Sequence, residues 1–160
     1  MKCNHNTRKN ISQFEYLELC SFDLNKDQYL KLEKRRKGIV WAELVIGQQF
    51  KCYYCNTDIR NIQKLILKRI IKLRKRGAYG YSGLHFELDH KNSNKEDNSS
   101  QNLVAACYYC NNDKSNTISE EVFLNYFGPQ RKIAFDKLFQ DNNFKSNDLF
   151  VHNLSLNNTK

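Results

Sequence analysis

Leu84-His85-Phe86-Glu87-Leu88-Asp89 alternates apolar and polar side chains, and this alternation predicts a β-strand. Its three apolar side chains are expected to face a core and its three polar ones the opposite side. Residues 91–101 are polar and predict a loop. Residues 103–106 then predict a second short strand, and residues 107–114 the start of a short helix. Two strands followed by a helix predict a small α+β unit.

Helices are predicted on both sides of this unit. Apolar side chains recur at helical spacing in residues 29–48 and 61–76, and Lys and Arg occupy most other positions of the second segment. Three glycines, the first of them Gly77, are expected to end that basic helix.

Beyond the unit, Ser119 is a good N-cap for a helix over residues 120–127, which Gly128-Pro129 is expected to end. A further helix is predicted over residues 131–140. The chain thus divides into three expected parts. They are an N-terminal arm and helix (1–48), a core with the inserted basic helix (49–118), and C-terminal helices with a tail (119–160).

Composition points to a polyanionic partner. The 160 residues include 26 Lys and Arg against 17 Asp and Glu, a net charge of +9. Such an excess favours nucleic acid, although a basic, solvated surface alone would have the same composition. No apolar run approaches the ~20 residues of a membrane span, and no signal peptide is evident. We therefore expect a cytoplasmic protein with reduced cysteines.

Four of the six cysteines form two Cys-x-x-Cys pairs, Cys52/Cys55 and Cys107/Cys110. Two such turns supply the four thiolates of a tetrahedral zinc site, which leaves no open coordination position and is therefore structural. The alternatives are two unrelated thiol pairs or a redox motif. A redox motif normally opens a helix of a thioredoxin-like βαβ unit, which this sequence does not predict.

The order of the remaining polar residues carries a resemblance. Asp89-His90 closes the first predicted strand, Asn102 precedes the second, and Asn111 and Lys114 lie on the helix after the second cysteine pair. With the two cysteine pairs, this order resembles the zinc-knuckle version of the HNH (ββα-metal) endonucleases. The resemblance covers residues 52–114 and implies a ββα-metal core around the four-cysteine zinc site, surrounded here by helices, that cleaves DNA.

The chemistry of these residues agrees with that resemblance. Phosphodiester hydrolysis needs an activated water and a metal that neutralises developing charge. Asp89 is a hard oxygen donor suited to Mg²⁺ or Mn²⁺, and the side-chain carbonyl of Asn111 is a second one. His90 is expected to act as the general base. By the resemblance, Asn102 ties the loop between the strands and so orients His90, and Lys114 contacts a phosphate.

Further cations of the predicted basic helix are expected to hold the nucleic-acid backbone, together with the Lys34-Arg35-Arg36-Lys37 run; a solvated helix face is the alternative. His85 and Glu87 are additional candidates near the site. The candidates for binding the nucleic-acid backbone are Lys68, Arg69, Lys72, Arg74 and Lys75.

Two features depart from the family pattern. They are the long segment before Asp89, and the absence of Pro and paired Gly from the loop of residues 91–101.

Competing functions remain at this point. One is a zinc-knuckle module that binds nucleic acid without cutting it, and another is a subunit of a larger defence complex. Within the nuclease interpretation, a restriction enzyme, a phage-defence effector, a homing enzyme and a junction resolvase all fit. DNA is the expected partner, and a homodimer would supply the two sites that cutting both strands of a duplex takes. No membrane partner is expected.

Overall fold

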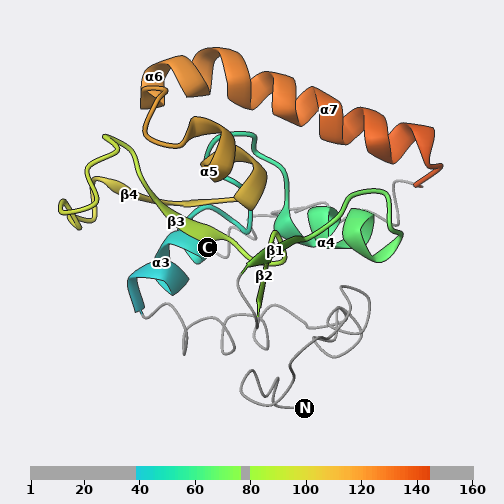
Figure 1. The fold of residues 1–160 in the computed structure, drawn as a ribbon, viewed down its shortest axis with the longest axis horizontal. Helices are drawn as coiled ribbons and strands as arrows, with labels where there is room; N and C mark the ends of the chain where they lie inside the picture. Colours follow the sequence, from blue (N-terminus) through green and yellow to red (C-terminus); the bar gives the residue numbers. More distant parts are fainter. Residues whose placement is uncertain (1–38, 77–79, 145–160) are drawn as a thin grey trace, which may run out of the picture.

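The computed structural model describes residues 39–76 and 80–144, which form a small α+β fold (Figure 1), so the predicted fold class is confirmed. The predicted N-terminal arm, residues 29–38 of the predicted helix, the Lys34–Lys37 run and residues 145–160 of the tail lie outside this part. The elements are α3 (Ile39–Gly47), α4 (Ile59–Leu67), β1 (Arg74–Arg76), β2 (Gly80–Ser82), β3 (Glu87–His90), β4 (Leu103–Ala106), α5 (Tyr108–Lys114), α6 (Glu120–Val122), the π-helical turn η1 (Phe123–Phe127) and α7 (Gly128–Asp141).

The central unit is the antiparallel pair β3–β4 with α5 against it. Glu87 pairs with Ala106 and His90 with Leu103, so the predicted strands and helix are confirmed, with β3 starting later than expected. Leu84 and Phe86 are buried and the half-buried Leu88 packs against the core, as predicted, but Asp89 on the opposite side is buried too, at 7 % exposed. The reason is that α5 covers the face of β3 from which Asp89 projects.

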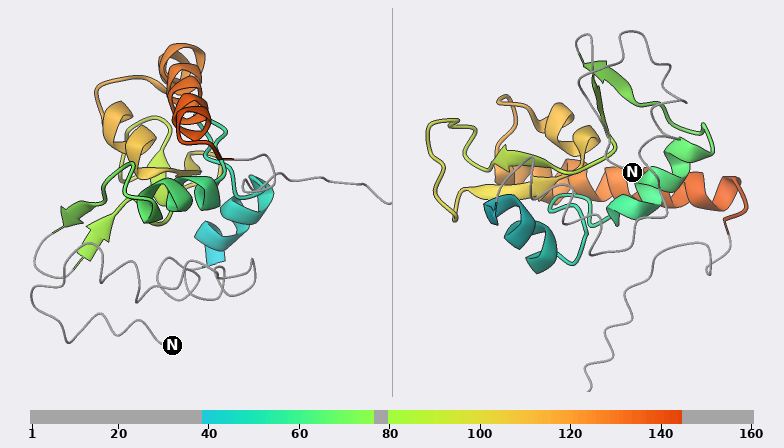
Figure 2. Two further views of the ribbon diagram at one scale, coloured as in Figure 1. Left: turned by 90° about the vertical axis from the view of Figure 1, so that its right-hand side faces the viewer. Right: turned by 90° about the horizontal axis from the view of Figure 1, so that it is seen from below.

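The predicted basic helix is half as long as expected. Asp58 caps the start of α4 by accepting a hydrogen bond from the Arg60 backbone N–H (2.9 Å). The helix ends at its C-cap Lys68, and Arg69 follows with a φ of 59°, in the left-handed region that breaks helical geometry. The chain then enters the antiparallel hairpin β1–β2, which projects from the body of the molecule (Figure 2). Lys72, Arg74 and Lys75 therefore lie at or on a hairpin and not on a helix.

The C-terminal helices are continuous, so the expected stop at Gly128-Pro129 is wrong. The Gly128 N–H bonds the Phe123 carbonyl, five residues back, and this π-helical step joins α6 to α7. Pro129, which has no N–H to donate, lies in the first turn of α7, where an unpaired N–H would be normal. Helix α7 then spans the segment predicted as residues 131–140.

Gly128 also lies against the first cysteine pair. A Cβ at this position would stand 2.3 Å from the Tyr54 carbonyl oxygen and 3.0 Å from its carbon. We predict that Gly128→Ala destabilises the fold by about 3 kcal/mol, because a backbone group must move to admit the methyl. The melting temperature, followed by circular dichroism, should fall by roughly 10 °C or more.

Gly47 supplies the matched control, because a Cβ there meets nothing within 4 Å and the residue lies in α3. Gly47→Ala should leave the melting temperature unchanged or raise it slightly. Equal melting temperatures for the two variants would contradict the close approach of α7 to the first cysteine pair.

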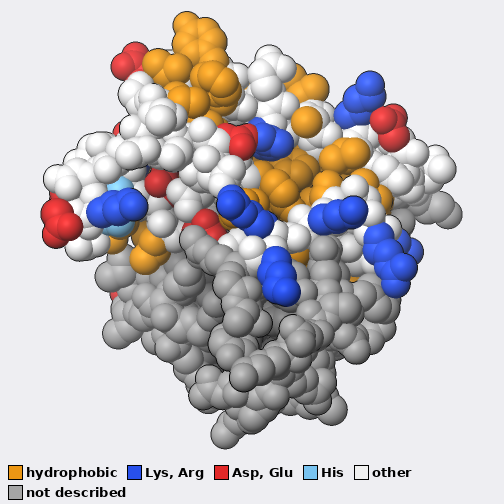
Figure 3. Space-filling model, viewed as in Figure 1, with side chains coloured by type: hydrophobic (Ala, Val, Ile, Leu, Met, Phe, Trp, Pro, Cys, Tyr) orange, Lys and Arg blue, Asp and Glu red, His pale blue; other side chains and the backbone are white. Residues whose placement is uncertain are grey.

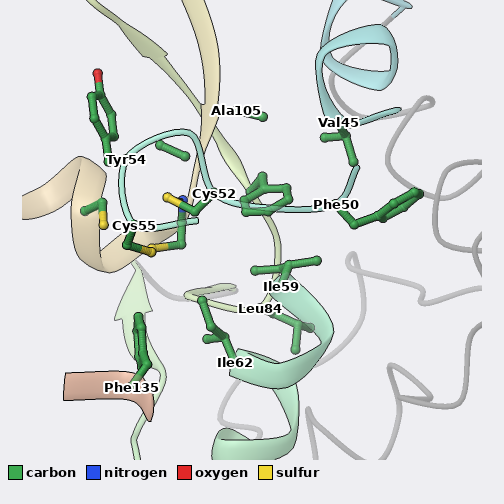
Figure 4. Packing of buried hydrophobic residues seen from close by; sticks show 14 of the residues in the cluster. Val45, Phe50, Cys52, Tyr54, Cys55, Ile59, Ile62, Leu84, Ala105 and Phe135 are labelled. Atoms are coloured by element: carbon green, nitrogen blue, oxygen red, sulfur yellow. The ribbon is translucent and has the colours of Figure 1, made fainter. Parts of the chain in front are cut away.

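One hydrophobic core joins the elements. Helix α4 contributes its apolar face, and α7 packs across it through aromatic side chains. Figure 4 shows the cysteine sulfurs at the edge of this packing, with the Tyr54 ring turned away from them. The fully buried large side chains include Val45, Phe50, Ile59, Ile62, Leu65, Ile66, Phe86 and Phe123.

None of the described helices has both the length and the apolar character needed to cross a membrane.

The outer edge of β4 is covered by the segment that carries the first cysteine pair. The Gln48 side-chain amide exchanges two hydrogen bonds with the Ala105 backbone, at 2.7 and 2.9 Å. The Tyr53 backbone N–H donates to the same carbonyl at 3.1 Å. These contacts bring Cys52 beside the end of β4, where the second pair begins.

Candidate metal centre and candidate active site

The four cysteines of the two pairs converge. Their sulfurs all lie within 4.8 Å of one another, and each residue is at most 1 % exposed. The Cys55 and Cys107 sulfurs are 4.0 Å apart, far longer than a disulfide bond of ~2.05 Å. A tetrahedron with metal–sulfur bonds of about 2.3 Å has sulfur–sulfur edges of roughly 3.8 Å. The cluster can therefore hold a metal ion such as zinc, as its spacing predicts.

The surroundings of the sulfurs also suit a cation. The Cys107 N–H donates to the Cys52 sulfur at 3.3 Å. Hydrogen bonds from the neighbouring cysteines lower the pKa of Cys55, whereas burial raises the pKa of Cys107. Four buried thiols at this distance cannot all ionise without a positive charge among them, and a bound metal supplies that charge.

The second cluster surrounds Asp89. The Tyr54 hydroxyl donates to Asp89 Oδ2 at 2.6 Å, and Lys114 Nζ lies 3.2 Å from the same oxygen. Burial and the hydrogen bond to Asp89 raise the pKa of Tyr54, so the phenol keeps its proton and acts as donor. Lys114 is fully buried and also donates to the His90 carbonyl at 3.1 Å.

This burial corrects the expectation for Lys114. A side chain with no exposed surface and a carboxylate partner does not reach a phosphate at the surface. Its position one turn beyond the second cysteine pair points it into the space between α5 and β3, where it neutralises Asp89.

Asn111 lies on the same face of α5, one turn before Lys114. Its Nδ2 donates to Glu87 Oε2 at 2.7 Å. A carboxylate only accepts hydrogen bonds, so Glu87 bonds the amide nitrogen of Asn111. The amide oxygen of Asn111 therefore points away from Glu87. The role of Glu87 was not predicted, although its place two residues before Asp89 puts both carboxylates on one face of the strand.

His90 and Asn102 belong to the loop side of the unit. His90 Nε2 lies 3.1 Å from Asn98 Oδ1 in the β3–β4 loop. Asn102 is buried, accepts from the Asn92 N–H at 3.0 Å and donates to the Asp97 carbonyl at 2.7 Å. It therefore ties both sides of the loop that follows His90.

The structure thus gathers the candidate residues into one unit without joining them directly. The side chains of Asp89, His90 and Asn111 hydrogen-bond Tyr54, Asn98 and Glu87 respectively, and within the described residues no hydrogen bond links any two of the three. Asp89 and Asn111 both take part in the contact of β3 with α5, and His90 ends the same strand.

The cationic residues beside this unit are exposed. Arg74 Nη1 donates to the Tyr108 hydroxyl and to Asn112 Oδ1, each at 3.0 Å, which attaches β1 to α5. The Tyr109 hydroxyl donates to the Lys72 carbonyl at 3.2 Å and attaches the preceding turn. The five predicted cations that remain exposed are Lys68, Arg69, Lys72, Arg74 and Lys75.

Comparisons of the chain with protein-family models, with curated proteins and with solved structures gave no match.

Proposed function

We propose that the protein is a metal-dependent endonuclease that hydrolyses phosphodiester bonds in DNA. The observation that supports this most is the ββα arrangement itself: a strand ending in Asp89-His90 lies against a helix carrying Asn111, and a four-cysteine centre anchors that helix. The family resemblance of these motifs points the same way. We infer that the four thiolates hold a structural zinc, since a closed sulfur tetrahedron suits it.

The candidate residues divide the chemistry among them. Asp89 offers a carboxylate oxygen and Asn111 an amide oxygen to a hard cation, Mg²⁺ or Mn²⁺. Such a cation, when bound, neutralises charge on the phosphate and the leaving oxygen. His90 takes the proton of the attacking water through its imidazole, which is only partly buried. Asn102 and Asn98 hold the loop and the ring in place.

The direct test is the conversion of supercoiled plasmid to nicked and linear forms by the full chain loaded with zinc. Cleavage is expected with added Mg²⁺ or Mn²⁺ and not without it. A zinc-loaded, folded protein that cuts neither plasmid nor single-stranded DNA with either metal would overturn the proposal.

A second function is favoured by one observation. The ion pair between Lys114 and Asp89 gives this carboxylate a structural partner in the absence of any hard cation. A zinc-knuckle module that binds nucleic acid without cutting it would use that pair for stability alone. Such a module binds one zinc per chain, does not bind Mn²⁺ and leaves the plasmid intact.

The proposed DNA-contacting surface lies on α4 and the β1–β2 hairpin. Residues 59–86 contain eight of the 26 basic residues and none of the 17 acidic ones, so this segment carries +8 of the net +9. Figure 3 shows Lys and Arg side chains gathered over this part of the described surface. Each phosphate contact releases counterions, so affinity should depend steeply on salt.

We predict that Lys72→Gln/Lys75→Gln makes the plot of log affinity against log salt less steep. The magnitude of its negative slope should fall by about 1.8, or about 0.9 for each lost phosphate contact. The measurement is fluorescence anisotropy of a labelled DNA duplex, in a His90→Ala background and without a divalent cation, so that the duplex is not cut during the titration. The matched control, Lys132→Gln/Lys137→Gln on α7, removes the same charge away from the hairpin. Equal slopes for the two double variants would show that net charge, and not this surface, governs binding.

A further inference from the structure

Asp89 is held by two buried side chains that bond one and the same oxygen. The phenol of Tyr54 donates to Oδ2 at 2.6 Å, and the ammonium of Lys114 forms an ion pair with the same oxygen at 3.2 Å. Tyr54 is 4 % exposed and Lys114 is 0 % exposed. Two partners on one oxygen restrict the rotation of the carboxylate, so its orientation depends on both of them.

The ammonium is itself held from three directions. Besides Asp89, Lys114 Nζ donates to the His90 carbonyl at 3.1 Å and lies 3.4 Å from Ser93 Oγ. An ammonium has three protons, and three acceptors are present for them. A buried charge with two hydrogen bonds and an ion pair is costly to displace, so the lysine is a rigid support.

Both partners of Asp89 are close in sequence to the cysteine pairs. Tyr54 lies between Cys52 and Cys55, and Lys114 lies one helical turn beyond Cys110 on α5. The backbone that bends around the sulfurs therefore also sets the two groups that bond Asp89. Figure 4 shows the Tyr54 ring directed away from the sulfurs, with its hydroxyl at the far end.

The other knuckle tyrosines make different contacts. The Tyr53 hydroxyl donates to Glu120 at 2.7 Å, and the Tyr109 hydroxyl donates to the Lys72 carbonyl. Tyr108 bonds Arg74 and Asn112. Among these four tyrosines, Tyr54 alone bonds Asp89, although the Cys-Tyr-Tyr-Cys-Asn sequence occurs twice.

We propose that Tyr54 and Lys114 are positioning residues that fix the Asp89 carboxylate for a divalent cation, and that the metal-loaded cysteine centre sets this geometry. The cation belongs to the function proposed above, so this inference rests on it. Because both contacts are made to Oδ2, we assign Oδ1 to the cation. The structural metal then affects the chemistry only through the position of these two side chains.

The test compares Tyr54→Phe with Tyr53→Phe in the zinc-loaded full chain. Each variant removes one hydroxyl hydrogen bond from the same turn, and each keeps the ring. Mn²⁺ affinity is measured without DNA, by electron paramagnetic resonance of the free ion. Because outer-shell partners typically contribute 10–100-fold to metal affinity, we expect Tyr54→Phe to weaken Mn²⁺ binding by about tenfold. Tyr53→Phe should bind as wild type does, and both variants should keep one zinc.

Three outcomes decide the matter. Weakened Mn²⁺ binding in Tyr54→Phe alone, with cleavage restored at higher Mn²⁺, supports the positioning role. Wild-type affinity in Tyr54→Phe overturns the positioning role and leaves the proposed nuclease standing. If wild type and Asp89→Asn both fail to bind Mn²⁺, the proposed cation site and the positioning role fall together. Lys114→Arg, which keeps the buried charge, should weaken binding as Tyr54→Phe does if it folds.

Discussion

Loss of the metal from the four-cysteine centre is expected to unfold the protein. Structural zinc contributes about 10–16 kcal/mol of apparent binding free energy in small domains at neutral pH. Domains of ordinary size are stable by only about 5–15 kcal/mol in total. The sulfurs join the segment before α4 to the end of β4 and to α5, so loss of the metal removes the link among these three segments.

Cys110→Ser is the most informative variant, because it removes the thiolate of a cysteine that lies within α5. We expect it to lose most of its zinc, measured by mass spectrometry of the metal content, and most of its helical circular dichroism. Cys20→Ser is the control, since Cys20 belongs to neither pair. Chelation of wild type should give the same loss, and added Zn²⁺ should reverse it.

A Cys110→Ser variant that stays folded would contradict the prediction. If Cys110→Ser kept the wild-type melting temperature, the cysteine cluster would be a group of buried thiols and not a metal centre. The hydrophobic core and the β3–β4 pairing would then hold the fold without a metal.

Replacement of His90 by alanine is expected to slow plasmid cleavage by about 10²–10⁴-fold, the usual contribution of a general base. Its side chain is only partly buried and hydrogen-bonds Asn98 in an exposed loop, so the fold should not depend on it. Zinc content and melting temperature should therefore stay at wild-type values.

Single-turnover cleavage rates at saturating metal measure this effect. His152→Ala, at a histidine outside the motif, is the matched control and should cut as fast as wild type. Equal rates for His90→Ala and wild type would exclude His90 as the base, and Asp89→Asn would then show whether a hard cation acts there at all.

The features that sequence alone predicted depend on local patterns. Strand alternation located β3, and the spacing of the cysteine pairs predicted the cluster that the structure contains. These predictions succeed because a strand has a period of two residues, and because a Cys-x-x-Cys turn directs both sulfurs to one point.

Helix limits depended on more than pattern. The apolar periodicity of the basic segment continues past Leu67, yet the chain leaves the helix at Lys68 and forms the β1–β2 hairpin. In the same way Gly128-Pro129 signals a stop, but a π-helical step carries the helix past it. Packing against the rest of the fold outweighs local preference at both places.

The partners of the site residues were decided by tertiary structure alone. Tyr54 and Asp89 are 35 positions apart, and Asn111 and Glu87 are 24 apart, so no local pattern predicts their contacts. The burial of Lys114 has the same origin. Residue type and spacing indicate which atoms are able to bind a metal. The packing of α5 on β3 excludes water from one face of the strand. Only this packing determines which of those atoms already bond another side chain and which can still bind a metal.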